Sequence, residues 1–270
     1  MCSSDLRPGA SRVKHAPRSC AGFDVPLGPD RCARWEWLEL KRNTGRLRTA
    51  LGENHEFTRS MRNPDFPLAT LFTLQQWQRD RLARTYSDFE SDQRYAPACR
   101  FFLDELYGGR DFSRRDQDVS QVLPVMVRMM PDELLGVVAQ AFELQALSLE
   151  LDTGMTNVML QQGWVELDKV RYGEIYRLFG HEADRHRQIE WTIGLGIALQ
   201  DFVHHRWVRL MLRMVRGPAR AAGFGKLQSF IERGFMAFRN MGDGSEFIDA
   251  IHSRESRIML SLLAGRDEVL

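Results

Sequence analysis

Residues 131–151 have the pattern of a helix that is apolar around most of its circumference, and this feature constrains the fold more than any other. Pro131 followed by two acids is typical of a helix start, because proline suits the first helical position and acids suit the N-terminal end of the dipole. A narrow polar stripe interrupts the apolar surface at Gly136, Gln140, Glu143 and Glu150. A helix with so little polar surface lies at the centre of its domain, covered by other elements.

The covering elements are also predicted to be helices. From Pro67 onward the apolar residues recur every three or four positions, and alternating β-branched runs are nearly absent. We expect an all-α fold, a single-domain multi-helix bundle of about nine helices. The expected helices cover roughly 67–89, 94–107, 114–124, 131–151, 167–179, 183–216, 225–241 and 245–263. The stretch 183–216 is expected to break at Gly217-Pro218.

The front of the chain is expected to lie outside this domain. Residues 1–35 are rich in Arg, Pro, Gly, Ser and Cys and have no helical or strand period, so they bury too little apolar surface to offset their ordering entropy. The string CSSDL also resembles the translated end of a common sequencing adapter. We therefore predict that residues 1–63 are largely disordered or spurious, with a possible short helix near 36–51. The helical domain is expected over 64–265, with 266–270 as a tail.

The charge distribution gives no reason to expect nucleic-acid binding. The net charge of +1 combines a basic front, with 12 Lys and Arg against 7 Asp and Glu in residues 1–63, and a mildly acidic remainder, with 25 against 29. A nucleic-acid surface needs clustered positive charge on the folded domain. No partner of this class is expected.

The four cysteines and the hydropathy pattern favour a soluble, cytoplasmic protein. Cys2, Cys20, Cys32 and Cys99 have neither metal-ligand spacing nor the density of a disulfide framework, and Cys99 is expected to be a buried free thiol. No run of about 18 apolar residues and no signal-peptide core is present in the sequence.

The stretch RFFLDELYGGRDFSRRD, residues 100–116, has the pattern of a structural corner between two helices. Aromatic and leucine residues would supply a buried face, two glycines would end the first helix in the left-handed conformation, and a serine and an acid would cap the second. These structural residues are Phe101, Phe102, Leu106, Gly108, Gly109, Ser113 and Asp116. A catalytic loop is the less favoured alternative, because the stretch itself contains no His, Cys or Lys to act as base or nucleophile.

At these residues the chain resembles a group of bacterial proteins known as FFLEELY-motif proteins. FFLDELYG and DFSRRD, followed by RGPARAAG, LQSFIERGFMAF and IHSRESRI, carry the resemblance, which covers roughly Tyr86 to Leu263. Asp104 stands where the motif has Glu. The resemblance implies one all-helical domain over this span and no particular reaction, cofactor or partner.

A di-metal carboxylate site is one functional hypothesis. Such bundles take one Glu from each of two helices and a Glu-x-x-His pair from each of two others, and they hold iron or manganese. The candidate ligands are Glu143, Glu150, Asp201, His204, Glu232, Asp249 and His252. Both pairs have Asp in place of the longer Glu, which shortens their reach, so a surface ion-pair stripe is the favoured alternative and no cofactor is expected.

Two further charged features are interpreted as structural or surface features. Glu255 falls between Ile251 and Ile258 on an apolar helix face, so we predict a buried ion pair with an Arg from another helix, in preference to a catalytic acid. The charged run 181–187 is interpreted as a solvated helix start.

A basic amphipathic helix supplies the candidate binding residues. They repeat every three or four positions beside an apolar face and are Arg206, Arg209, Arg213 and Arg216. The leading hypothesis is a non-enzymatic binding or interaction module that engages a protein partner or an apolar, acidic ligand. The alternatives are the di-metal oxidoreductase and a peripheral membrane or lipid-associated protein. The sequence identifies no catalytic residue and no oligomeric state.

Overall fold

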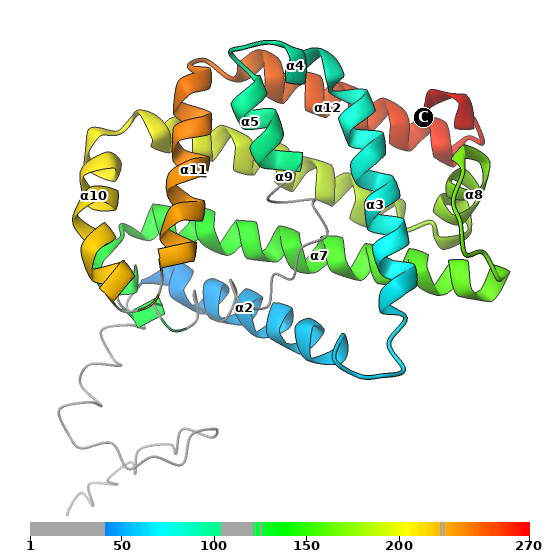
Figure 1. The fold of residues 1–270 in the computed structure, drawn as a ribbon, viewed down its shortest axis with the longest axis horizontal. Coiled ribbons are helices and arrows are strands. Elements are labelled where there is room, and N and C mark those ends of the chain that lie inside the picture. The colour runs from blue at the N-terminus through cyan, green and yellow to red at the C-terminus, as the bar shows by residue number, and fades with distance from the viewer. Residues whose placement is uncertain (1–40, 104–120, 122, 125, 222, 224) are drawn as a thin grey trace, which may run out of the picture.

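The structure is a computed structural model that describes residues 41–103, 121, 123–124, 126–221, 223 and 225–270. These residues form helices and no strand, and eight of the helices are long, which confirms the all-α prediction. The helices, labelled as in Figure 1, are α2 (Arg42–Ser60), α3 (Leu68–Thr85), α4 (Ser87–Ser91), α5 (Ala96–Phe101), α7 (Asp132–Gln162), α8 (Lys169–Phe179), α9 (Glu182–His204), α10 (Arg206–Ala221), α11 (Gly225–Met241), α12 (Ser245–Leu263) and the 3-10 helix η2 (Asp267–Val269).

Helix α7 is the central element (Figure 1). It begins directly after Pro131, as predicted, but its 31 residues run past the expected end near Leu151 to Gln162. The extension exists because the buried face continues: Met155 and Met159 are completely buried. At a rise of 1.5 Å per residue, α7 is about 46 Å long. Within the described part of the chain it is also the one helix long and apolar enough to cross a membrane, but four other helices pack against it, which identifies it as a core helix.

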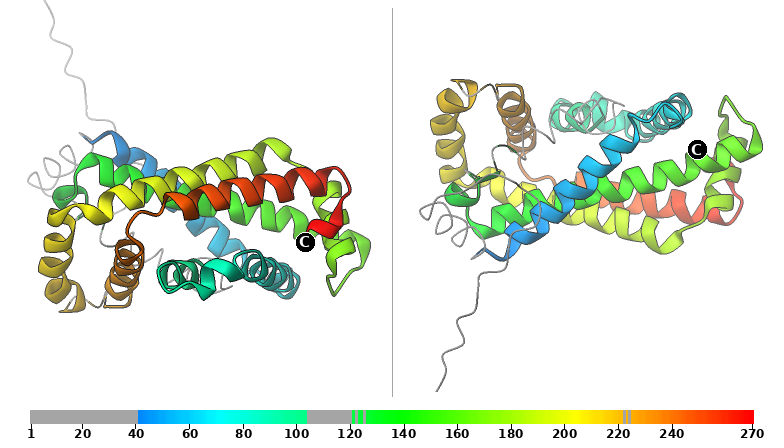
Figure 2. Two further views of the ribbon diagram at one scale, coloured as in Figure 1. Left: turned by 90° about the horizontal axis from the view of Figure 1, so that it is seen from above. Right: turned by 90° about the horizontal axis from the view of Figure 1, so that it is seen from below.

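The other helices cover α7 from several directions. Helix α9 runs along α7, and α12 runs along α9 on the side away from α7 (Figures 1 and 2). Figure 2 shows α10 and α11 standing across one end and α8 at the other. Helices α3, α4 and α5 lie over one side of this layer. Helix α2 crosses α7 on the side away from α12 (Figure 1).

Helix α2 corrects the expected domain boundary. It spans Arg42–Ser60, longer than the possible short helix near 36–51, and it packs along α7 as part of the core. Leu47, Ala50 and Leu51 of α2 are buried against α7, and the side-chain amide of Asn54 donates to the carbonyl of Phe142 at 2.9 Å. The boundary at Pro64 is therefore too late. The prediction failed because these residues form a narrow apolar stripe on an otherwise polar helix.

The break in the long stretch 183–216 lies earlier than predicted. Helix α9 ends at His204, and His205 is extended with ψ of 121° before α10 begins. Pro218 lies inside α10 and does not end it. The chain turns at His205 because α9 packs on α7 and α12, whereas α10 packs mainly on α11.

The expected tail 266–270 belongs to the fold. It contains η2, and a guanidinium nitrogen of Arg177 on α8 lies 2.5 Å from a carboxylate oxygen of Asp267. Gly173, one turn earlier on α8, has no side chain to obstruct Asp267. The last residues therefore pack against α8.

We predict that Leu47→Ala destabilises the protein by about 2–5 kcal/mol, because it removes a completely buried side chain between α2 and α7. Urea unfolding followed by circular dichroism measures this. Leu178→Ala, at an exposed position of α8, is the matched control and is expected to cost less than about 1 kcal/mol. Equal costs for the two variants would show that α2 is not part of the core.

Candidate functional site

A cavity of about 110 Å³ lies inside the bundle, between α3, α7, α8, α9 and α12. Its lining is unusual for a helical core because half of it is polar. The polar lining residues are Gln78, Arg81, Tyr86, Ser148, Asp152, Tyr172, Tyr176, Arg185, Gln188, Thr192 and Glu255. Apolar side chains from α3, α7, α9 and α12 complete the wall, together with Cys99 of α5 and the two residues that follow α5, Phe102 and Leu103.

A buried ion pair forms one side of the cavity. One terminal nitrogen of Arg81, on α3, donates to both carboxylate oxygens of Glu255, on α12, at 2.6 and 2.8 Å. The hydroxyl of Tyr86 donates to the same carboxylate at 2.9 Å. The prediction that Glu255 pairs with an Arg from another helix is confirmed. Burial disfavours the Arg81 cation, but the negative charge of Glu255 offsets this effect and raises the Arg81 pKa above its ordinary value.

Arg185 also lines the cavity and is only 5% exposed. It lies in the first turn of α9, where its Nε donates to the carbonyl of Gly180 at 2.9 Å. Its guanidinium lies over the ring of Tyr176, 3.6 Å from the centroid. The interpretation of residues 181–187 as a solvated helix start is wrong for this residue. His181, Asp184 and neighbouring charges pair on the surface, while Arg185 points inward.

Asp152 of α7 is the second carboxylate of the wall. Its two oxygens accept hydrogen bonds from Gln75 and Gln78 of α3, at 3.0 and 3.1 Å. Burial raises the pKa of Asp152, and these hydrogen bonds and the charge of Arg185 only partly oppose the effect. Among the described residues no ion pair joins Asp152 to Arg185, whereas Glu255 lies 2.6 Å from Arg81.

Each arginine leaves one nitrogen without a partner. In the part of the chain that the structure describes, Nε of Arg81 and Nη2 of Arg185 are buried and make no hydrogen bond. Arg81 and Arg185 both line the cavity. A buried N–H without an acceptor costs about 1–3 kcal/mol. An acceptor that reached either nitrogen would recover this cost.

The proposed metal ligands do not come together. Glu143 pairs with Arg46 of α2 at 2.7 Å, Glu232 pairs with Arg216 at 2.7 Å, and Glu150 is exposed. Asp201, His204, Asp249 and His252 are also exposed. Among the residues that the structure describes, no group of three or more His, Cys, Asp and Glu could hold a metal ion. The di-metal hypothesis is corrected, because each motif carboxylate faces a cation or solvent.

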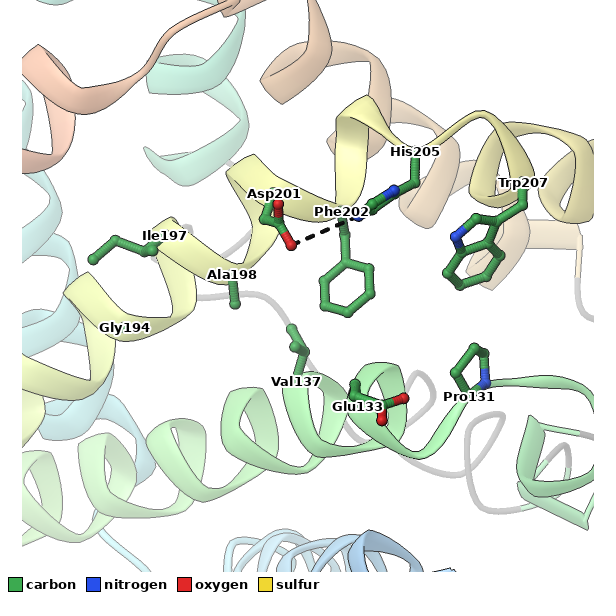
Figure 3. A pocket seen from close by; sticks show the side chains of 10 residues that line it. All are labelled: Pro131, Glu133, Val137, Gly194, Ile197, Ala198, Asp201, Phe202, His205 and Trp207. Atoms are coloured by element: carbon green, nitrogen blue, oxygen red, sulfur yellow. Dashed lines mark ion pairs between the residues drawn. The ribbon is translucent and has the colours of Figure 1, made fainter.

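Asp201 instead lines an open groove of about 730 Å³ at the junction of α7, α9 and α10 (Figure 3). Its carboxylate lies 3.7 Å from Nε2 of His205, and both side chains are well exposed. Figure 3 shows Phe202 and Trp207 beside this pair, facing Val137 and Pro131 across the groove. The groove is lined mostly by apolar residues. Asp201 and His205 form an ion pair at the surface.

The predicted binding arginines lie on the exposed surface of α10. Arg206, Arg209 and Arg213 make no hydrogen bond or ion pair within the described residues. Arg216 differs, because its guanidinium forms two hydrogen bonds with Glu232 of α11, at 2.7 and 2.9 Å.

Residues 100–103 of the predicted corner are described by the structure, and two of them, Phe101 and Phe102, are among its expected structural residues. Phe101 packs against Phe230, with ring centroids 5.3 Å apart, and occupies the space left by Gly234. Phe102 lines the cavity. The remaining corner residues lie outside the described part of the chain, so the corner itself stays a prediction. They are Leu106, Gly108, Gly109, Ser113 and Asp116.

Comparison with known proteins identifies a family. The family described as "Domain of unknown function (DUF8198)" matches residues 58–269. The chain belongs to this family. No curated protein and no solved structure matches the chain. The matched span contains all the residues that line the cavity. The resemblance to FFLEELY-motif proteins stays a prediction.

The sequence carried one signal for the cavity that was missed. Arg81 lies four residues after Trp77 and seven after Leu74, so it falls on the apolar face of the first predicted helix. A cation in that position needs a buried partner. Tyr172 and Tyr176, spaced four apart, gave a weaker signal, and nothing local distinguished Arg185 from its solvated neighbours.

We predict that Glu255→Gln destabilises the protein by about 3 kcal/mol, because it leaves the Arg81 cation buried without its counter-charge. Chemical denaturation measures the change. Asp249→Asn removes a carboxylate from the exposed face of the same helix and is expected to change the stability by less than about 0.5 kcal/mol. Adding Arg81→Met to Glu255→Gln should restore part of the loss. No recovery in the double variant would mean that the pair is not the cause.

Proposed function

We propose that the protein is a non-enzymatic binding protein for a small organic anion, held in the internal cavity. One observation carries the proposal: two buried arginines line the same cavity, and each has a nitrogen for which the described residues supply no acceptor. Arginine is the side chain best suited to hold a carboxylate in a dry site, because its planar fork donates in parallel and its charge does not titrate.

The size and the lining of the cavity favour a short carboxylic acid. A volume of about 110 Å³ admits an anion of only a few non-hydrogen atoms. The arginines would receive its charged end, and side chains such as Leu151, Ile258 and Met259 would contact its apolar end. Such a ligand has the apolar, acidic chemistry expected from the sequence.

Binding is favoured over catalysis because the described wall does not present a recognisable catalytic group. Cys99 is buried, and its thiol lies 4.0 Å from the backbone carbonyl of Tyr86, which is not a general base. The described lining contains no histidine. Asp152 is the candidate base, and two glutamines already occupy its oxygens. A protein partner and a cytoplasmic location stay predictions of the sequence.

The proposal predicts that propionate raises the melting temperature of the protein, whereas propionamide, its neutral isostere, does not. Propionate at about ten times its Kd would stabilise the folded state by about 1.4 kcal/mol, or about 3–5 °C for a chain of this size. Differential scanning fluorimetry at constant ionic strength measures the shift. Equal shifts with the acid and the amide, or none with either at about 20 mM, would refute the proposal.

Two matched variants test whether the propionate-induced shift in melting temperature arises in the cavity. Arg185→Gln removes a buried charge from the cavity and should abolish the propionate shift. Arg187→Gln removes a half-exposed charge two residues later on α9 and should leave the shift unchanged. Native mass spectrometry of the unmodified chain tests the same point independently of variant folding, because a retained anion would appear as added mass.

Anion affinity should also fall as the pH rises. Burial raises the pKa of Asp152 above its ordinary value of 3.8, so the carboxyl is neutral below this raised pKa and anionic above it. The anionic form repels a bound anion and competes for Arg185. Methanesulfonate is the suitable probe, because its own charge is constant between about pH 4 and 8. Calorimetry should show weaker binding at the higher pH, and Asp152→Asn should remove the dependence. A pH-independent affinity in the unmodified protein would contradict this role of Asp152.

A further inference from the structure

Helix α10 carries two parallel stripes on its solvent-facing half. The arginine stripe consists of Arg206, Arg209, Arg213, Arg216 and Arg220, and every one of its members is exposed. The apolar stripe consists of Trp207, Leu210 and Met214, spaced three and four residues apart. Since residues three and four apart lie on one helix face, the two stripes run side by side along the helix axis.

The apolar stripe is not the core-facing side of the helix. Val208, Met211 and Leu212 are buried and face α11 and α9. Trp207, Leu210 and Met214 are 37%, 56% and 57% exposed. The helix therefore has more apolar surface than its own fold uses, in a contiguous line. Contiguous exposed apolar surface with a polar border is typical of an interaction site.

All the charged side chains of α10 are positive. The helix contains five arginines and no Asp or Glu. Glu232 of α11 neutralises Arg216, but Arg206, Arg209 and Arg213 remain without an acidic partner among the described residues. Those three flank Trp207 and Leu210 in the sequence. The occupant of this surface must therefore supply anionic groups close to an apolar phase.

The position of α10 favours a flat occupant. In Figures 1 and 2, α10 forms the outermost wall at one end of the molecule in all three views. Its axis lies across this end, roughly perpendicular to α7 and α9 (Figure 1). An extended surface can approach the whole length of α10 without meeting another described element. The nearby concave groove would suit an acidic protein segment less well, because Glu133 and Asp201 line it.

We propose that α10 docks the protein onto an anionic phospholipid surface. Trp207, Leu210 and Met214 enter the boundary between headgroups and acyl chains, where an indole ring is well accommodated. Arg206, Arg209 and Arg213 contact the lipid phosphates. The docking leaves the cavity untouched, since no cavity-lining residue lies on α10. The proposal is therefore independent of the small-anion ligand.

The test uses the full chain with vesicles of phosphatidylglycerol and phosphatidylcholine in a ratio of about 3:7, and with phosphatidylcholine alone. Co-sedimentation should show binding to the anionic vesicles only, weakened by salt. Each arginine near such a surface contributes about fivefold to the affinity, so Arg209→Glu with Arg213→Glu should weaken binding at least about 25-fold. Leu210→Ser should weaken it at unchanged charge.

Two controls make the outcome specific. Arg42→Glu with Arg62→Glu changes the net charge equally at exposed positions of α2 and its C-terminal flank, and should leave vesicle binding within about twofold. Equal losses in the two double variants would overturn the proposal, because net charge alone would explain them. Absence of binding to the anionic vesicles at low salt would also overturn it. Binding to soluble poly-glutamate that rivals vesicle binding and is insensitive to Leu210→Ser would assign the surface to an acidic macromolecule instead.

Discussion

The need to cover α7 on nearly every side determines the arrangement of the other helices. Each Å² of apolar surface that such a helix leaves in water reduces the free energy of unfolding by about 25 cal/mol. One neighbouring helix cannot cover the whole circumference of α7, because its polar stripe is so narrow. The chain therefore places α2, α3, α8 and α9 around it. This requirement explains why α2, which is weakly apolar on its own, is held in the core. Its few buried residues cover apolar surface of α7 that would otherwise be exposed to water.

The cavity lies between α7 and several of the helices around it, namely α3, α8, α9 and α12. Straight helices pack closely at their crossing points, and the space between two crossings is filled by long side chains. Beside Asp152 that filling is done by arginine, glutamine and tyrosine instead of leucine. A wall of hydrophobic residues of similar volume would be equally stable or more so, since burying charges is costly. The polar wall therefore points to function, because stability does not require it.

The sequence predicts features that depend on one helix at a time and fails where two distant segments decide the outcome. The apolar surface of α7, the helices expected over 225–241 and 245–263 and the buried partner of Glu255 follow from local spacing, and the structure confirms them. The extent of α2 and the inward direction of Arg185 depend on surfaces supplied by α7 and α8, which no local pattern reveals. The metal hypothesis failed for the same reason. Correct spacing along each helix did not determine which faces would meet.

Arginine has opposite roles at the two sites because its solvation differs. On α10 the guanidinium groups are hydrated and screened, so a small dissolved anion gains little by binding one of them. Only a surface that presents many phosphates and an apolar phase together could use the arginine and apolar stripes at once. In the cavity the two guanidinium groups have already lost most of their water, so a single anion small enough to enter gains from both. A bilayer cannot reach the cavity. The two proposed sites would therefore recognise anions of different size, one kind in the interior and the other at the surface.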